Sequence, residues 1–384
     1  MDLNSMLRRA VELGASDVHL KLGRPPIIRR DGELAPLEGT PPLEPADFER
    51  ALAIVAAGRP ERLARFEETG ELDLAYSDDD LPRFRVNVFR QRGAVSFAFR
   101  VIPATVPSFE ELSLPPGVRR LASEQRGLVL VTGATGAGKT TTLAAMIDHM
   151  NRTRRRHIVT IEDPIEILHP DRESIVSQRE VGLDTLSFGE ALRRALRQDP
   201  DVILIGELRD AETAQTALQA AESGHLVLST LHTLDAAETC GRVVEFFPTD
   251  KQGVIRSILA GVLRGVVSQR LLPRDGGGRV AAVEVMVTNA RIADLIREGR
   301  PEEIHDALAD GGYLEMQTFL DALVGLVLNG IVEAEVAANA ATNRHDFLIA
   351  LQKAERQRVV DRAAPVAPEP PPESPTGLRI VPAG

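Results

Sequence analysis

The sequence is poor in cysteine and in aromatic residues, and each shortage excludes a class of protein. Cys240 is the single cysteine among 384 residues, which excludes a disulfide framework and a tetracysteine zinc module. Tryptophan is absent and aromatic residues make up 4% of the chain, so few side chains could stack on the bases of a nucleic acid. We therefore expect neither zinc nor nucleic acid as a partner.

Long apolar runs and an excess of positive charge are also missing. No apolar run of membrane-spanning length is free of charges, and no signal peptide is recognisable, which favours a cytosolic protein. The chain carries 56 acidic and 45 basic residues, a net charge of −11. This balance argues against a broad surface that coats phosphates, although it is compatible with a local basic groove. The length suits two or three domains.

Residues 1–102 have the pattern of a compact α+β domain. Apolar spacing predicts helices at 3–14 and 45–58, and alternating segments at 71–77, 83–91 and 94–102 predict an antiparallel sheet. Two further strands are expected at 16–23 and 25–34, the second with an Asp31-Gly32 turn. The proline-rich stretch 103–116 is the best candidate for a linker.

From residue 117 to residue 288 short, continuously apolar strands alternate with helices. This pattern is typical of an α/β fold with a parallel sheet that helices cover on both faces. The strands are "GLVLVTG" (127–133), "RHIVTIED" (156–163), "DVILIGE" (201–207) and "HLVLSTLH" (225–232). Residues 289–360 are expected to be mostly helical. Residues 361–384 are rich in proline and predict a disordered tail, either inert or a PxxP-type docking segment.

The segment "GATGAGKT", from Gly133 to Thr140, matches the phosphate-binding motif G-x-x-x-x-G-K-[ST] in full. An apolar strand precedes it and a helical stretch follows it, which is the context that the motif requires. The glycines let backbone N–H groups curl around a phosphate, Lys139 reaches the β- and γ-phosphates, and the Thr140 hydroxyl is available to Mg²⁺. The residues expected to bind ATP are Gly133, Thr135, Gly136, Ala137, Gly138, Lys139, Thr140 and Thr141.

Acidic residues end two of the apolar strands. A P-loop enzyme needs an acid at the end of a neighbouring strand to hold Mg²⁺ or its water. Glu207 ends "DVILIGE", and Glu162 and Asp163 end "HIVTIED". The carboxyl ends of parallel strands meet at one edge of the sheet, where ligands bind. We therefore expect both glutamates beside Lys139 in a catalytic site.

Two histidines bracket the apolar run "HLVLSTLH". Along an extended strand, the rings of His225 and His232 should lie roughly 20 Å apart, so they cannot share one metal ion. His232 falls at the carboxyl end of the strand, with Lys139 and the two glutamates. It is a candidate for sensing phosphate or for contacting another subunit. His225 falls at the opposite end, where a structural and a catalytic role remain equally open.

These segments follow the order found in a known family. "GATGAGKT", "TIEDPIE", "VILIGE" and "GHLVLSTLH" together resemble the secretion ATPases, and "GASDVHL", "RFRVN" and "QREVGLDT" are similar to the PilT/PilU motors that retract type IV pili. The resemblance implies a homohexamer in which an N-terminal PAS-like domain is linked to a RecA-like P-loop ATPase with a helical C-terminal part, binding ATP and Mg²⁺. It also implies docking on a platform protein at the inner membrane, with or without a paralogous retraction ATPase.

The resemblance assigns roles to single residues. Glu162 matches the acid that activates water, and Glu207 matches the acid that lies near Mg²⁺. Arg85 and Arg100 match N-terminal arginines that reach the nucleotide phosphates, although their pattern alone is that of a solvated strand face. Further candidates, for arginine contacts between subunits, are Arg194 and Arg209.

One segment departs from the retraction motors, which typically read Ala-Ile-Arg-Asn-Leu-Ile-Arg-Glu in the C-terminal region. Residues 291–298 here read Arg-Ile-Ala-Asp-Leu-Ile-Arg-Glu, so that only the second half is retained. A primary retraction motor and an accessory PilU-like ATPase therefore both remain open.

Other functions fit less well. Pilus-extension and secretion ATPases resemble longer chains with a tetracysteine insert, which a single cysteine does not supply. A RecA-type DNA motor is disfavoured by the acidic balance and the few aromatic residues. A nucleotide-binding regulator without turnover would need neither Glu162 nor Glu207.

Overall fold

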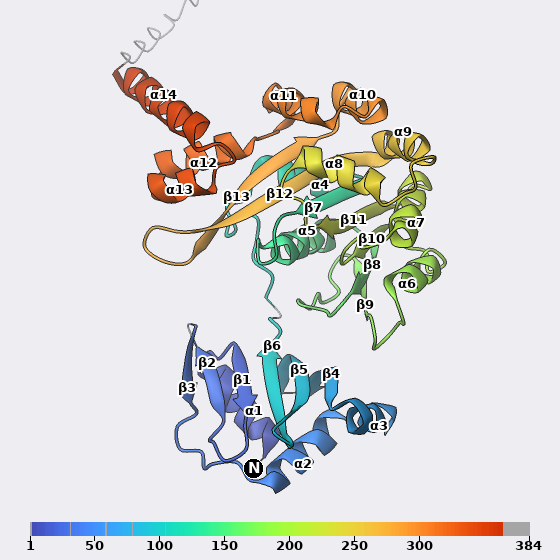
Figure 1. Ribbon diagram of the computed structural model, residues 1–384, viewed down its shortest axis with the longest axis vertical. Coiled ribbons are helices and arrows are strands. Elements are labelled where there is room, and N and C mark those ends of the chain that lie inside the picture. The colour runs from blue at the N-terminus through green and yellow to red at the C-terminus, as the bar shows by residue number, and fades with distance from the viewer. Residues whose placement is uncertain (1, 31, 58–59, 79, 104, 364–384) are drawn as a thin grey trace, which may run out of the picture.

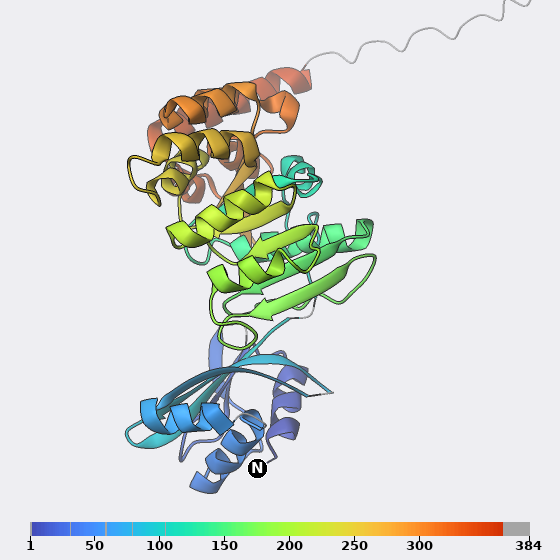
Figure 2. The same cartoon turned by 90° about the vertical axis from the view of Figure 1, so that its right-hand side faces the viewer.

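The computed structural model describes residues 2–30, 32–57, 60–78, 80–103 and 105–363. Asp31 of the expected turn and residues 364–384 of the expected tail lie outside this range. Two sheets organise the mixed α/β fold, one between residues 17 and 101 and the other between residues 127 and 287. Figure 1 shows the N-terminal sheet in the lower part, the second sheet in the middle and the last helices at the top. Figure 2 shows the same parts stacked along the long axis.

The first sheet is antiparallel and has the strand order β3-β2-β1-β6-β5-β4. Its strands are β1 (Asp17–Leu20), β2 (Ile27–Arg30), β3 (Glu33–Pro36), β4 (Glu71–Asp78), β5 (Leu81–Gln91) and β6 (Ala94–Val101). Alternating residues of β5 and β6 are buried, among them Phe84, Phe97 and Phe99, whose rings pack together beneath the helices. The antiparallel sheet expected from the alternating segments is therefore present.

Three helices accompany this sheet: α1 (Leu3–Glu12), α2 (Pro45–Val55) and α3 (Pro60–Thr69). The first two overlap the helices expected at 3–14 and 45–58, and each ends before the expected boundary. Helix α3 was not predicted, because Phe66 is its only buried residue and no repeated apolar face marks it in the sequence.

The second sheet has seven strands in the order β13-β12-β7-β11-β10-β8-β9. They are β7 (Gly127–Thr132), β8 (His157–Glu162), β9 (Ile175–Glu180), β10 (Val202–Ile205), β11 (Leu226–Leu231), β12 (Leu263–Pro273) and β13 (Arg279–Val287). Every residue of β7, β10 and β11 is buried, as expected for strands covered on both faces. The sheet is not wholly parallel, because β13 pairs antiparallel with β12 in a hairpin whose connection spans residues 274–278.

Helices α4 (Pro116–Ala122), α5 (Lys139–Thr153), α6 (Phe188–Ala195), α7 (Ala211–Glu222), α8 (Ala236–Glu245) and α9 (Gln252–Val262) cover this sheet. Capping side chains set where three of them begin: Ser187, Asp210 and Asp235 accept hydrogen bonds from the first turns of α6, α7 and α8. The expected linker is not free of the second sheet, since Phe109 is buried in the same hydrophobic core.

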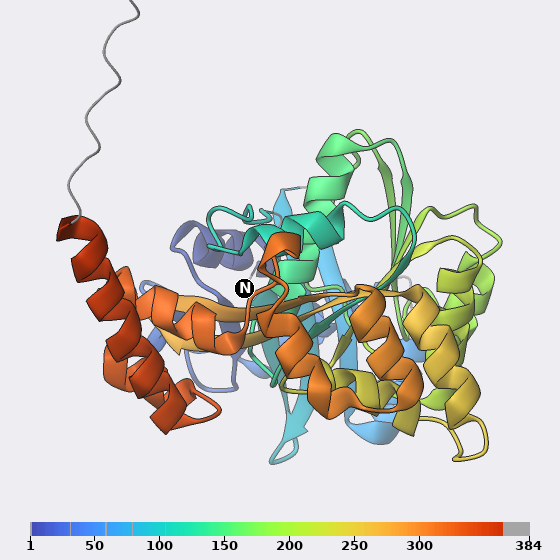
Figure 3. The same cartoon turned by 90° about the horizontal axis from the view of Figure 1, so that it is seen from above.

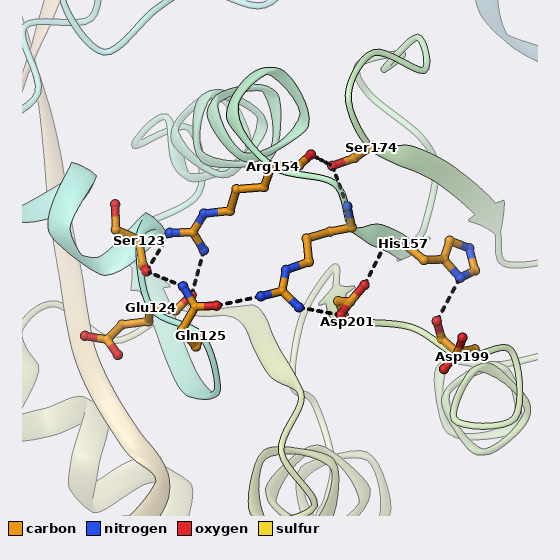
Figure 4. A network of polar contacts seen from close by, with 9 residues as sticks. Ser123, Glu124, Gln125, Arg154, His157, Ser174, Asp199 and Asp201 are labelled. Atoms are coloured by element: carbon orange, nitrogen blue, oxygen red, sulfur yellow. Dashed lines mark hydrogen bonds and ion pairs between the residues drawn. The ribbon is translucent and has the colours of Figure 1, made fainter.

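A polar network ties the amino ends of the strands together (Figure 4). The guanidinium of Arg154 donates to the carbonyl oxygens of Ser123 (2.6 Å) and Glu124 (3.0 Å). Arg156, two residues further on, donates to Asp201 at 2.6 Å, and the Asp201 carboxylate also accepts from the backbone N–H of His157 at 2.9 Å. The network fixes α4, α5, β8 and β10 at the edge opposite the phosphate-binding motif.

The last part of the described chain is helical, as expected. Helices α10 (Ala290–Glu298) and α11 (Ile304–Ala309) pack on the main core, while α12 (Phe319–Leu328), α13 (Ala334–Ala340) and α14 (Arg344–Ala363) form a separate cluster with β12 and β13. Short 3₁₀ turns occupy Pro301–Glu303 and Gly312–Leu314. Figure 3 shows α14 at one side of the molecule. Because α14 runs to Ala363, the first residues of the expected tail are helical and not disordered.

Within the described ranges, no helix combines the length and the apolarity that a bilayer crossing requires.

Candidate functional site

The phosphate-binding loop joins the end of β7 to the start of α5. Gly133 has φ 139°, and a Cβ there would lie 2.4 Å from the carbonyl oxygen of Gln269, so only glycine fits. Gly138 takes the left-handed conformation, φ 91°, directly before α5 begins at Lys139. The loop therefore delivers the free N–H groups of a helix start into the space in front of it, which suits an anion.

The loop opens into a cleft of about 880 Å³. This cleft brings together four predicted residues from four separate segments: Lys139 at the start of α5, Glu162 at the end of β8, Glu207 after β10 and His232 after β11. The predicted loop residues from Thr135 to Thr141 also line it. The strand order explains this convergence, since β7, β11, β10 and β8 are neighbours and all run parallel.

Glu162 is a buried acid held by two donors. Its Oε1 accepts hydrogen bonds from the hydroxyl of Thr160 (2.6 Å) and from Nε2 of Gln178 (3.0 Å). Its side chain is only 8% exposed, and this burial raises the pKa of Glu162 above its usual value despite both hydrogen bonds. A carboxylate with a raised pKa is a stronger base, which suits it to accept a proton.

Glu207 has different surroundings. It forms an ion pair with Arg209, and its Oε2 lies 3.6 Å from Nε2 of His232. Burial works to raise the pKa of Glu207, but the hydrogen bond and charge of Arg209, with His232, outweigh burial and hold that pKa below its usual value. Glu207 is therefore an anion over the whole physiological range, which suits it to hold a cation.

Lys139 is folded back on its own loop. Its Nζ donates to the carbonyl oxygens of Gly133 (2.7 Å) and Ala134 (3.1 Å). Burial lowers the pKa of Lys139, and the negative charges of Glu207 and Glu166 oppose that shift. Glu166 also lines the cleft and was not predicted as a site residue, although it follows Glu162 within "TIEDPIE".

The two histidines lie at opposite ends of β11. The side chain of His232 is 56% exposed and faces the cleft. His225 lies at the amino end, where its Nδ1 is 3.0 Å from the carbonyl oxygen of Ala220 and 3.0 Å from the hydroxyl of Ser223. Among the described residues, no group of three or more His, Cys, Asp or Glu side chains is placed to hold a metal ion. The position of His225 favours a structural role.

The two predicted N-terminal arginines lie side by side on neighbouring strands, but they differ in whether they line the cleft. Arg85 on β5 and Arg100 on β6 are cross-strand partners. Arg100 lines the cleft and donates to Asp17 at 2.9 Å, whereas Arg85 is exposed and does not line the cleft in the described structure. Arg83 on β5 was not predicted as a site residue. It pairs at 2.8 Å with Glu180 at the end of β9, and so joins the N-terminal sheet to the second sheet.

The other two predicted arginines, Arg209 and Arg194, also differ in whether they reach the site. Arg209 reaches the site through its ion pair with Glu207. Arg194 lies on the surface of α6, 3.8 Å from Glu190, and does not line the cleft.

Residues of the expected linker also line the cleft, and sequence reasoning missed them. They are Glu111, Leu112, Ser113 and Leu114. No motif marks them, because they reach the cleft only through the folding of residues 105–116 onto α5.

Comparisons with known proteins place the chain in a family. The profile of the family "Type II/IV secretion system protein" matches residues 1–278. The chain is 46% identical over 347 residues to the "Type IV pilus retractation ATPase PilT" of Pseudomonas aeruginosa, covering 90% of this chain and 100% of that protein. It is 40% identical over 353 residues to the "Type IV pilus ATPase PilU" of the same organism, covering 92% of each.

A solved structure is equally similar. The fold matches "Crystal Structure of the Pilus Retraction Motor PilT and Bound ADP" with a TM-score of 0.84 and 45% identity, covering 90% of this chain and 98% of that one. The chain thus belongs to the type II/IV secretion system protein family and is a PilT/PilU-like secretion ATPase.

Proposed function

We propose that this chain is the ATP-hydrolysing motor that powers retraction of type IV pili, working as a homohexamer. The observation that carries the proposal is the 46% identity to a pilus retraction ATPase over that protein's whole length. The residues that hydrolysis needs, Lys139, Glu162 and Glu207, also converge on one cleft. In this proposal residues 1–102 form a PAS-like domain and residues 117–288 a RecA-like ATPase.

The loop fits the phosphates of ATP. A Cβ at Gly136 or at Gly138 would meet no atom within 4 Å, so the backbone there is open to a ligand on the cleft side. The N–H groups of this loop would bind the phosphates, and Lys139 would exchange its two loop carbonyls for the β- and γ-phosphate oxygens. Arg100, which already lines the cleft, would add positive charge, and Arg85 would follow if the N-terminal part closed further.

Mg²⁺ prefers oxygen ligands, and the cleft offers the Thr140 hydroxyl and the ionised Glu207 carboxylate, the latter through a water. When bound, the ion would neutralise charge on the β- and γ-phosphates. Glu162 would orient the attacking water and accept its proton, because it is a buried carboxylate with a raised pKa. His232, 3.6 Å from Glu207, would register the state of the phosphates.

The proposed motor would work at the cytoplasmic face of the inner membrane, docked on a pilus platform protein. Deleting the gene tests this proposal. A retraction motor predicts cells that carry excess surface pili and do not twitch. Cells without pili would indicate an extension ATPase, and cells with normal pili and normal twitching would contradict both functions.

An accessory, PilU-like role is a second candidate. It is supported by the 40% identity to PilU over 92% of each chain and by the altered first half of residues 291–298. This segment forms α10, in which Ile292 and Ala293 are buried and Arg291 reaches Asp310 at 2.9 Å. An accessory ATPase would fail to restore twitching when it is the sole retraction ATPase in a cell, whereas a primary motor would restore it.

A further inference from the structure

The edge strand β9 contacts Glu162, the carboxylate proposed to accept the proton of the attacking water. The strand runs parallel to β8, and Glu180 is the direct register partner of Glu162. The carbonyl oxygen of Glu162 accepts from the backbone N–H of Val181 at 2.8 Å, and its Oε1 accepts from Gln178 at 3.0 Å. The position of β9 therefore sets both the backbone and the carboxylate of Glu162.

Two side chains of the N-terminal part contact the carboxyl end of β9 and the residues that follow it. Arg83 of β5 donates from its Nη2 to Oε2 of Glu180 at 2.8 Å, and Arg62 of α3 donates to the carbonyl oxygen of Gly182 at 3.0 Å. Both contacts join segments about a hundred residues apart, so they exist only when the N-terminal part is docked on its own ATPase part.

Glu180 joins this contact to the loop that follows Glu162. The same Oε2 atom that pairs with Arg83 also accepts from the backbone N–H of Ile165 at 3.3 Å. Ile165 lies between Glu162 and Glu166, both of which line the cleft. Glu180 is 6% exposed when the N-terminal part is docked, and its carboxylate then has Arg83 as a cationic partner. Undocking would remove that partner and open the carboxylate to water, which would compete for its hydrogen bond to Ile165.

We propose that Glu180 is a positioning residue that couples docking of the N-terminal part, through Arg83, to the placement of Glu162. Hydrolysis then runs fast only in the docked arrangement. The N-terminal part acts on the reaction through β9 as well as through any arginine that reaches the phosphates. This inference rests on the proposed function, in which Glu162 accepts the proton of the attacking water.

The test uses the full-length protein with the variants Arg83→Gln, Glu180→Gln, their double variant and Arg83→Lys. Arg90→Gln is the matched control, since Arg90 lies on the same strand and pairs at 2.8 Å with Glu67 of the N-terminal part. ATP turnover gives kcat and KM, a fluorescent ATP analogue gives the nucleotide Kd, and hydrogen exchange of a peptide covering 163–168 follows the loop.

Arg83→Gln and Glu180→Gln should each lower kcat by about tenfold, below the hundredfold that a 1 Å misplacement can cost. Nucleotide Kd should stay within about twofold, because the phosphate-binding loop is untouched. The double variant should be no slower than either single variant, because each single substitution already breaks the Arg83–Glu180 ion pair. Exchange at 163–168 should rise in each, Arg83→Lys should recover most of the rate, and Arg90→Gln should match the wild type.

A normal kcat in Arg83→Gln, or losses that multiply in the double variant, would overturn the coupling. A higher Kd at unchanged kcat would instead make Arg83 a nucleotide ligand, and also overturn it. Glu162→Gln, assayed in parallel, separates this failure from failure of the proposed function. Wild-type turnover in Glu162→Gln contradicts the assigned base, whereas a dead Glu162→Gln beside a normal Arg83→Gln contradicts only the coupling.

Discussion

At the scale of single residues, two glutamates at the same edge of one sheet have pKa values shifted in opposite directions. Burial dominates for Glu162 and raises its pKa, while Arg209 and His232 overcome burial for Glu207 and lower its pKa. One fold thus places a carboxylate that is suited to accept a proton and a carboxylate that stays ionised in the same cleft. This separation of roles follows from the neighbours of each carboxylate and not from residue type.

Exchanging each acid for its amide should separate the two roles. Glu162→Gln should lower kcat by at least about a hundredfold while ATP and Mg²⁺ remain bound, because only the proton acceptor is lost. Glu207→Gln should instead raise the Mg²⁺ concentration needed for half-maximal turnover. Steady-state kinetics with Mg²⁺ titration distinguish the two variants, and the reverse pattern would exchange their roles.

The raised pKa of Glu162 also predicts a pH dependence. A general base must be ionised, so turnover should fall as the pH drops through the pKa of Glu162, which lies above that of a free glutamate. The low-pKa acid Glu207 stays ionised over that range. A kcat–pH profile of the wild type should show this acidic limb, and residual turnover by Glu162→Gln should lack it.

The position of the phosphate-binding motif between an apolar strand and a helix could be predicted from the sequence, because its residues are contiguous. Glu162, Glu207 and His232 could be placed as well, since each ends an apolar strand. Glu111 and the Arg83–Glu180 pair could not be predicted, because their roles arise only from contacts between segments that are distant in the sequence. Arg85 and Arg100 show the limit of strand patterns, which give the face of a residue but not how near it lies to another domain.

At the scale of elements, strands were predictable where burial on both faces leaves a continuous apolar run. β7, β10 and β11 meet that condition. β9 does not, since most of its residues are half-buried at the sheet edge and its sequence "IVSQRE" is largely polar. β12 carries Arg264, Gln269 and Arg270 within a largely apolar stretch. These polar residues interrupt the apolar run, so neither β12 nor its antiparallel partner β13 was predicted as a strand.

The positions of His225 and His232 at opposite ends of β11 predict different effects when each is replaced by alanine. His232→Ala should lower kcat by about tenfold, equivalent to about 1.4 kcal/mol and comparable to one hydrogen bond at the cleft. His225→Ala should leave basal turnover near normal and lower the free energy of unfolding by about 1 kcal/mol, because it removes a contact to the end of α7. Turnover assays and thermal denaturation measure the two effects, and equal loss of turnover in both variants would contradict the assignment.

At the scale of the whole molecule, the cleft joins all the parts that a motor must couple. Arg100 comes from the N-terminal sheet, Leu112 from the connecting segment, Lys139 from the start of α5 and Arg279 from the β12–β13 hairpin, on which α12, α13 and α14 pack. In the proposed function, a change of nucleotide in the cleft would move these parts of one subunit relative to one another. In the proposed hexamer, each such movement would also displace the neighbouring subunits.

That coupling predicts how inactive subunits affect a ring. Lys139→Ala removes the cation for the β- and γ-phosphates and should abolish turnover without disturbing the fold, because the hydrogen bonds of its Nζ go to carbonyl oxygens of its own loop. If subunits must act in sequence, one inactive site stalls its neighbours. Mixed rings, made by co-expressing differently tagged wild-type and Lys139→Ala chains in varied ratios, should therefore lose activity more steeply than the wild-type fraction falls. A strictly proportional loss would mean that the sites work independently, and would count against a coordinated hexameric motor.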